Sequence, residues 1–199
     1  MIISNVTKRT VNFVDGQNMK HALIIADMIN DFVTGTLKVK RAQAIIPNIR
    51  ELLKLARKNK LVTIHVTDSH LPKIDPEFDL WGPHAARGSW GSQIIDEFKP
   101  KEDEYRVLKR KYSAFQGTEL DMLLRELKIE AVILTGVLTD ICIQHTAADA
   151  FSKSYKVIIP KDCVETLDEP TQEYALNFMR KNYGAEITTV NELAKKKWM

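Results

Sequence analysis

Short apolar runs alternate with amphipathic segments along most of the chain. The apolar runs cover residues 21–26, 61–66, 105–108, 131–135 and 156–159, with a weaker run at 186–190. Helical spacing of apolar positions is found between them, at residues 42–58, 118–127, 140–153 and 171–181. Short apolar runs that alternate with helices are typical of βαβ units, whose strands are buried on both faces. We therefore expect a three-layer α/β/α fold on a doubly wound, mainly parallel, six-stranded sheet.

One long segment, residues 67–104, breaks this alternation. It contains Pro72, Pro76, Pro83 and Pro100 and two of the three tryptophans, Trp81 and Trp90. A loop of this length inside a compact domain is usually functional. Elsewhere the chain shows no repeat and no linker, so we expect a single domain over residues 1–199, with residues 1–20 forming an N-terminal arm.

Composition and charge narrow the classes of function. The 199 residues are 44% hydrophobic, which is enough for a sizeable core, and the formal net charge is only +3. This charge does not indicate a nucleic-acid partner. Two cysteines do not form a disulfide framework, and the sequence shows neither a secretory signal nor an apolar run of about 20 residues. We expect a reduced, cytoplasmic protein with a small-molecule partner and no membrane partner.

Polar residues follow the predicted strands at the point where each strand ends. Asp27 follows the first run, Asp68 and His70 follow the second, Lys109 follows the third, and Cys142 lies just beyond the fourth. In doubly wound sheets, ligands bind outside the C-terminal ends of the strands. These side chains are therefore expected to meet at one edge of the sheet.

This set of groups suits a cysteine that attacks an amide. Asp140 is placed to cap a helix, which puts Cys142 in the first turn, where the helix dipole and free N–H groups favour the thiolate. Asp27 can carry the proton, and Lys109 supplies a positive charge close to both. The backbone N–H groups of Leu138 and Cys142 are candidates for the oxyanion hole.

Each of these residues also has an ordinary structural interpretation. Taken alone, Asp27 is a typical helix cap, Lys109 a typical surface charge with Lys111 as a rival, and Cys142 a typical small buried residue. His145, one helical turn beyond Cys142, suggests a Cys–His pair but is more simply a structural histidine. Only the combined pattern favours an enzyme.

Three blocks of the sequence match a known family. They are ADMINDF at 26–32, KRKYSAF at 109–115 and GVLTDIC at 136–142. On these blocks, and on a match from about Ala22 to the C-terminal helix, the chain resembles the isochorismatase-like cysteine hydrolases, and within them the nicotinamidases. The resemblance implies a catalytic triad of Asp27, Lys109 and Cys142, which selects Lys109 over Lys111. It also implies a cis peptide between Val137 and Leu138.

The resemblance further implies a metal site in the long loop. Its ligands would be the following residues: Asp68, His70, Glu77 and His84. Two imidazoles with one or two carboxylates suit one divalent transition metal, zinc in first place and iron or manganese otherwise. Ser69 and Ala85 depart from residues often found in the nicotinamidases, which leaves the shape of the pocket and the metal preference open.

The walls of a pocket for a flat heteroaromatic ring would come from four residues: Phe32, Tyr112 and Val137 in the blocks, and Trp81 in the segment that leads to His84. The implied activity is metal-dependent hydrolysis of nicotinamide and pyrazinamide to the carboxylic acid and ammonia, through a thioester on the cysteine. The resemblance also implies a role in pyridine nucleotide salvage and NAD biosynthesis, and a homo-oligomer. The alternatives are another amide or N-carbamoyl hydrolase, a vinyl-ether hydrolase that needs no metal, and a non-catalytic binding module.

Overall fold

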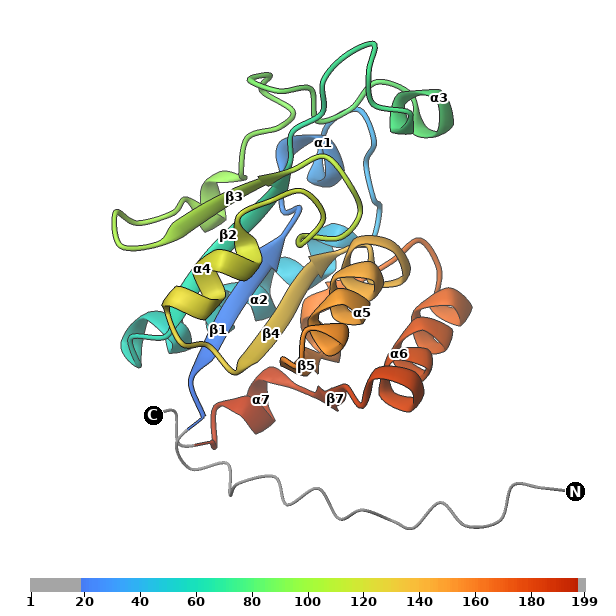
Figure 1. Ribbon diagram of the computed structural model, residues 1–199. Coiled ribbons are helices and arrows are strands. Elements are labelled where there is room, and N and C mark those ends of the chain that lie inside the picture. Colours follow the sequence, from blue (N-terminus) through green and yellow to red (C-terminus); the bar gives the residue numbers. More distant parts are fainter. Residues whose placement is uncertain (1–18, 197–199) are drawn as a thin grey trace, which may run out of the picture.

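A computed structural model describes residues 19–196, and within this range seven parallel strands form one sheet (Figure 1). The strands are β1 His21–Ala26, β2 Val62–Asp68, β3 Tyr105–Lys109, β4 Ala131–Val137, β5 Lys156–Pro160, β6 Val164–Glu165 and β7 Glu186–Thr188. The three-layer, doubly wound prediction is confirmed. The additional strand is β6, whose two residues are too few to show a pattern in the sequence. Residues 1–18 of the expected N-terminal arm lie outside the described residues.

The predicted helices are present close to their expected bounds. They are α2 Ala42–Lys58, α4 Leu120–Glu126, α5 Gln144–Ser152 and α6 Glu169–Tyr183, and a π-helical turn at Thr139–Ile143 leads into α5. The short helices α1 Asn30–Val33, α3 Glu77–Trp81 and α7 Val190–Leu193 and the 3-10 turns Asp96–Phe98 and Lys161–Cys163 were not predicted, because so few residues show no period. No helix between residues 19 and 196 is both long and apolar enough to cross a membrane.

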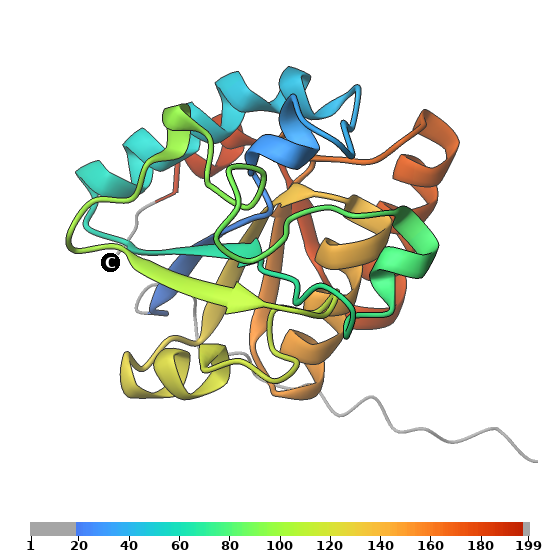
Figure 2. The same ribbon diagram turned by 90° about the horizontal axis from the view of Figure 1, so that it is seen from above.

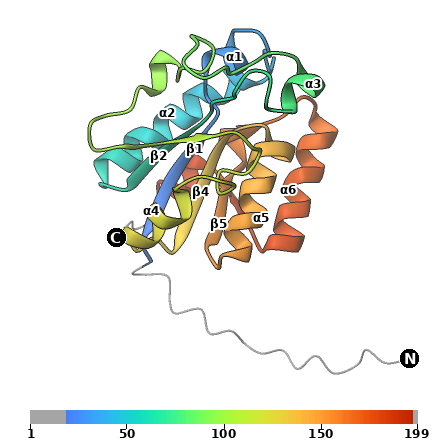
Figure 3. The same cartoon turned by 45° about the horizontal axis from the view of Figure 1, so that its top comes forward.

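Helices cover both faces of the sheet, and β1 shows why (Figures 2 and 3). Leu23 and Ile25 belong to the core cluster under α2 and α7, whereas Ala22 and Ile24 belong to the cluster under α4, α5 and α6. All four side chains are at most 2% exposed. Successive strand residues point to opposite faces, so an uninterrupted apolar run is what a strand covered on both sides requires.

Capping residues in the sequence set both ends of α6. Asp168 begins the helix, since its carboxylate accepts a hydrogen bond from the Thr171 N–H at 2.9 Å. Gly184 ends it in the left-handed conformation, with φ at 62°. Between these two residues α6 packs against α5 on one face of the sheet.

The order of strands in the sheet places the functional edge. The path runs β3-β2-β1-β4-β5-β7, so the direction of winding reverses between β1 and β4. The two strands approach so closely there that a Cβ on Gly136 would lie 1.8 Å from the Ala26 carbonyl oxygen, and Gly136 has a φ of 111°. Only glycine fits this position. A crevice at such a reversal is where doubly wound proteins bind ligands.

Candidate active site

The three predicted catalytic side chains meet at the C-terminal edge of the sheet. Asp27 directly follows β1, Lys109 is the last residue of β3, and Cys142 lies in the π-helical turn after β4. The Lys109 ammonium is 2.9 Å from Asp27 Oδ2 and 3.4 Å from Cys142 Sγ. All three side chains are buried, whereas Lys111 is exposed. The structure therefore brings Lys109, not Lys111, to the cysteine.

Asp68 joins this group from the end of β2. Its Oδ1 lies 2.5 Å from the Lys109 ammonium, and its backbone N–H donates to Asp27 Oδ1 at 2.8 Å. Asp27 Oδ2, although within ion-pair distance of Lys109, makes no aligned hydrogen bond with the described residues. One carboxylate oxygen of Asp27 and the sulfur of Cys142 lie within 4.8 Å of each other, so Asp27 is close enough to exchange a proton with the thiol.

Charge balance decides which of these groups hold protons. Two buried carboxylates share one ammonium, and burial together with the charge of Asp68 raises the pKa of Asp27 to about 6. Burial alone would lower the pKa of Lys109, but the two carboxylates outweigh it and hold that pKa well above its ordinary value. Lys109 therefore stays charged, and Asp27 is the group that titrates near neutral pH.

Cys142 lies in the helical turn after β4, as predicted, but its burial there works against the thiolate that a helix N-terminus favours. Burial raises the pKa of the Cys142 thiol well above its ordinary value, and the opposing charge of Lys109 does not offset this. Asp140 does not cap the helix either, because its carboxylate accepts a hydrogen bond from the Thr166 hydroxyl. Burial disfavours the charged thiolate, so the reaction of Cys142 needs a base that takes its proton.

The peptide between Val137 and Leu138 is cis, as the resemblance implied. Leu138 and Cys142 both line the cavity at this edge of the sheet. The assignment of their N–H groups to an oxyanion hole stays a prediction.

The four predicted metal ligands also meet, on the other side of Asp68. One donor atom from each of Asp68, His70, Glu77 and His84 lies within 4.8 Å of the others. His70 Nε2 is 3.7 Å from Asp68 Oδ2 and 3.7 Å from Glu77 Oε2. His84 Nδ1 lies 2.7 Å from the carbonyl oxygen of Gly82, to which it donates, and this leaves Nε2 as the nitrogen with a free lone pair.

These residues fit a divalent transition metal. His70 Nε2 is buried and makes no hydrogen bond with the described part of the chain, although an unsatisfied buried nitrogen is costly. Two imidazole nitrogens and two carboxylates form a donor set that suits zinc, iron or manganese. The chemistry of this donor set and the orphaned nitrogen both indicate a metal centre.

Backbone pairing brings the two histidines together from distant positions in the loop. The His70 N–H donates to the carbonyl of Ala85, and the Arg87 N–H donates to the carbonyl of His70, each at 2.9 Å. Asp31 fixes the second arm, because its Oδ2 accepts a hydrogen bond from the Ala85 N–H at 2.8 Å. Ala85 has a φ of 44°, in the left-handed region. This turn places His84 beside His70, with ring centroids 4.8 Å apart.

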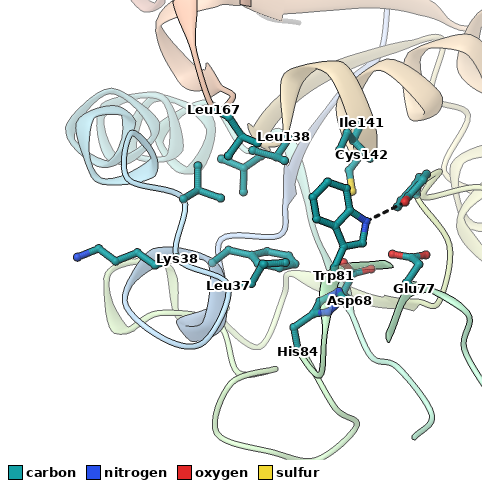
Figure 4. Close-up of a pocket in the computed structure, with 14 residues that line it drawn as sticks. Leu37, Lys38, Asp68, Glu77, Trp81, His84, Leu138, Ile141, Cys142 and Leu167 are labelled. Atoms are coloured by element: carbon teal, nitrogen blue, oxygen red, sulfur yellow. Dashed lines mark hydrogen bonds between the residues drawn. The ribbon is translucent and has the colours of Figure 1, made fainter. Parts of the chain in front are cut away.

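A cavity of about 140 Å³ opens onto the cysteine and the candidate metal ligands (Figure 4). The four predicted wall residues all line it: Phe32, Trp81, Tyr112 and Val137. The Trp81 indole N–H donates to the Tyr112 hydroxyl at 3.0 Å, which fixes the indole plane. Lys38 is the only cationic residue in the lining, and its ammonium points away from the cavity (Figure 4). The volume is below the roughly 300 Å³ of ordinary ligand pockets, so the site suits a small molecule.

Sequence reasoning missed several residues of the site. Leu37, Val39, Ile141 and Leu167 complete the apolar wall. Leu37, Val39 and Leu167 come from segments whose approach to Cys142 depends on the tertiary fold, and no motif marks them. Ile141 lies in the third matching block, directly before Cys142. Asp31, which lies in the first matching block, anchors the loop that carries His84.

His145 has the structural role that the simpler interpretation assigned to it. Its Nδ1 donates to the carbonyl oxygen of Ile141 at 2.7 Å, and its ring packs 5.4 Å from that of Tyr112. The side chain is exposed. It therefore does not form a pair with Cys142.

Comparisons with known proteins agree with this geometry. The model of the isochorismatase domain matches residues 21–192. The chain is similar to N-carbamoylsarcosine amidase from Thermoplasma acidophilum, with 38% identity, a TM-score of 0.82, and coverage of 87% of this chain and 98% of that one. It is also similar to nicotinamidase PncA from Bacillus subtilis, with 32% identity, a TM-score of 0.80, and coverage of 85% and 99%. Pyrazinamidase of Pyrococcus horikoshii, whose structure is a complex with zinc, is 28% identical, with a TM-score of 0.79 and coverage of 85% and 99%.

Proposed function

The chain belongs to the isochorismatase family of hydrolases, and on that premise we propose that it is a zinc-dependent nicotinamidase. It converts nicotinamide, and pyrazinamide, to the carboxylic acid and ammonia. The observation that carries the proposal is the shared carboxylate of Asp68. One of its oxygens contacts the catalytic Lys109 and the other faces the histidine cluster, so the donor set and the nucleophile open onto one small cavity.

The walls of the cavity bind and orient the substrate. Phe32 and Trp81 offer ring faces to a flat heteroaromatic ring, and Cys142 lines the same space. When bound by Asp68, His70, Glu77 and His84, a divalent metal ion supplies a Lewis acid for the ring nitrogen. A ring anchored at one end and stacked on aromatic side chains presents its carboxamide carbon to the sulfur.

Acylation begins with the Cys142 thiol and the Asp27 carboxylate. Asp27 takes the thiol proton while the sulfur forms a bond to the carboxamide carbon, whose oxygen becomes negative. The N–H groups of Leu138 and Cys142 stabilise that oxygen. As the oxyanion collapses, Asp27 donates the proton to the departing nitrogen, so ammonia leaves and a thioester remains. The pKa of Asp27, raised to about 6, suits a group that accepts and returns a proton.

Deacylation uses the same residues in a second cycle. Asp27, again ionised, takes a proton from water while the water oxygen attacks the thioester carbon. Collapse of this second oxyanion breaks the carbon–sulfur bond, and Asp27 returns the proton to the sulfur of Cys142. Lys109 keeps its charge throughout, so it holds both groups in place and offsets negative charge that develops on sulfur.

A second candidate is an N-carbamoyl amidase, which the likeness to the Thermoplasma acidophilum enzyme favours. N-carbamoylsarcosine carries a carboxylate, and a pocket that binds a carboxylate usually offers it a fixed cation. Here Lys38 is the only cation in the lining, it is exposed, and it points away from the cavity (Figure 4). This arrangement offers a substrate carboxylate no side-chain ammonium or guanidinium inside the cavity, and the aromatic walls favour the flat heteroaromatic amide.

The test is an ammonia-release assay over nicotinamide, pyrazinamide and N-carbamoylsarcosine, before and after removal of metal by a chelator and again after zinc is restored. We expect the highest kcat/KM with nicotinamide, loss of activity with the chelator and recovery with zinc. Faster turnover of N-carbamoylsarcosine, without need of metal, supports the second candidate. Absence of turnover with every amide supports a binding module and contradicts the proposal.

A further inference from the structure

A buried carboxylate lies on the far side of His70 from the cavity. Asp75 is 4% exposed, and its Oδ2 lies 3.4 Å from His70 Nδ1 and 2.7 Å from the Leu71 N–H, which donates to it. The Arg110 guanidinium holds both oxygens of Asp75, with Nε 3.1 Å from each and a terminal nitrogen 2.5 Å from Oδ1. A carboxylate in this position has its own orientation fixed by three donors.

His70 therefore lies between two carboxylates, and each of them pairs with a basic residue at the end of β3. Lys109 contacts Asp68, and Arg110 contacts Asp75. His70 presents Nε2 to Asp68 and Nδ1 to Asp75. Because an ionised Asp75 only accepts hydrogen bonds, the proton of a neutral His70 belongs on Nδ1, and the lone pair of Nε2 faces the other donor atoms.

We propose that Asp75, anchored by Arg110, is a positioning residue that fixes the ring plane and the tautomer of His70 so that Nε2 ligates the metal. The inference rests on the metal centre of the proposed function, but not on the identity of the substrate. A metal-bound histidine usually donates its second N–H to a carboxylate or carbonyl, and loss of that partner typically lowers metal affinity 10–100-fold. His84 has such a partner in the Gly82 carbonyl, and Asp75 supplies the corresponding partner for His70.

The chain contains a matched arrangement away from the cavity. Glu104 accepts hydrogen bonds from Arg57, at 2.7 and 3.0 Å, and lies 2.9 Å from His65 Nε2. Like His70, His65 is buried and has one nitrogen without a hydrogen-bond partner in the described structure. His65 belongs to no cluster of candidate ligands among residues 19–196. This second arginine–carboxylate–histidine set therefore controls for the general effect of disrupting a buried network.

The test compares Asp75→Asn with Glu104→Gln in the full chain. Each protein is stripped of metal, and its zinc dissociation constant is measured by competition with a chromophoric chelator. Asparagine can turn its NH₂ group toward His70 Nδ1, which drives the proton to Nε2 and blocks the ligand. We expect a 10–100-fold weaker zinc affinity for Asp75→Asn. We expect no change for Glu104→Gln, and a shift of the visible absorption bands of the cobalt-loaded protein only in Asp75→Asn.

A second pair, Arg110→Met and Arg57→Met, keeps the inference testable if Asp75→Asn does not fold. Arg110→Met leaves Asp75 in place without its anchor, so zinc affinity falls, whereas Arg57→Met leaves it unchanged. Unchanged zinc affinity and an unchanged cobalt spectrum in Asp75→Asn overturn the inference, as does an equal loss in Glu104→Gln. So does a wild-type protein that hydrolyses nicotinamide without binding zinc, which keeps the proposed nicotinamidase reaction but removes its zinc dependence. A different result separates the two proposals. If the wild-type protein binds zinc but does not cleave nicotinamide, and Asp75→Asn binds zinc more weakly, the inference is supported and the proposed activity is overturned.

Discussion

Replacing Lys109 by methionine tests whether one buried ammonium holds the two carboxylates of the site together. Lys109→Met keeps the length and most of the volume of the side chain and removes only the charge. In the wild-type protein the ammonium lies 2.9 Å from Asp27 and 2.5 Å from Asp68, and none of the three side chains is more than 3% exposed. The variant leaves two carboxylates facing each other with no counterion.

The magnitude follows from these distances. At an effective dielectric constant of about 20, ion pairs at 2.9 and 2.5 Å are worth about 6 and 7 kcal/mol. Most of this gain is offset in the wild type by the cost of removing the ammonium from water. Breaking a buried pair from one side typically costs 3–5 kcal/mol, and we expect a loss of that size for Lys109→Met at pH 8. With an m-value of 1–3 kcal/mol/M, the urea midpoint falls by roughly 1 to 5 M.

The assay is urea unfolding of chelator-treated protein at pH 8 and pH 5. Asp27 already has a folded pKa of about 6, raised above its ordinary 3.8, and loss of Lys109 raises it further. A carboxyl group whose pKa is raised by folding destabilises the folded state above that pKa, and the penalty shrinks as the pH falls. Lys109→Met must therefore lose less stability at pH 5 than at pH 8. Equal losses at the two pH values, or no loss at either, would show that the ammonium of Lys109 does not hold the two carboxylates together.

Three further predictions follow from contacts elsewhere. Gly136→Ala places a Cβ 1.8 Å from the Ala26 carbonyl oxygen at a φ of 111°, and we expect the free energy of unfolding to fall by about 4 kcal/mol or more, measured by urea unfolding. Tyr112→Phe removes the 3.0 Å hydrogen bond to Trp81, worth about 1 kcal/mol of stability, so the melting temperature falls by about 2–4 °C, and kcat/KM for nicotinamide falls in initial-rate assays because the indole is no longer held in place. Burial alone would raise the pKa of Glu104, but the hydrogen bonds that it accepts lower it from 4.5 to about 2. Stability from a carboxyl group with a depressed pKa is present above pH 4.5 and lost toward pH 2, and Glu104→Gln should flatten this part of the stability–pH curve.

The layered fold and the positions of the catalytic side chains could be predicted because both follow from local patterns. Apolar runs gave the strands β1 to β5, and the polar residue after each run marked the edge where ligands bind. Asp27 and Lys109 were found in this way. The protonation of Cys142 could not be predicted, because its pKa depends on how deeply the thiol is buried and on which charges surround it.

The residues that hold the catalytic and metal-binding side chains in place also could not be predicted from the sequence. Asp75 precedes a proline in a loop, as many turn-forming aspartates do, and nothing in one sequence shows that Arg110 and His70 converge on it. The double role of Asp68 is hidden for the same reason, since its two oxygens serve two sets of partners that only the fold brings together.

The central claim is that Cys142 forms a thioester with the acyl group of nicotinamide, and acid quenching during turnover followed by peptide mass spectrometry tests it most directly. Cys163 is a second buried, unpaired thiol and serves as an internal control. In the wild-type protein we expect a nicotinoyl group on the peptide that contains Cys142 and none on the peptide that contains Cys163. In Cys142→Ala we expect neither the adduct nor ammonia release. Continued turnover by Cys142→Ala, or an acyl group on Cys163 alone, would contradict the central claim.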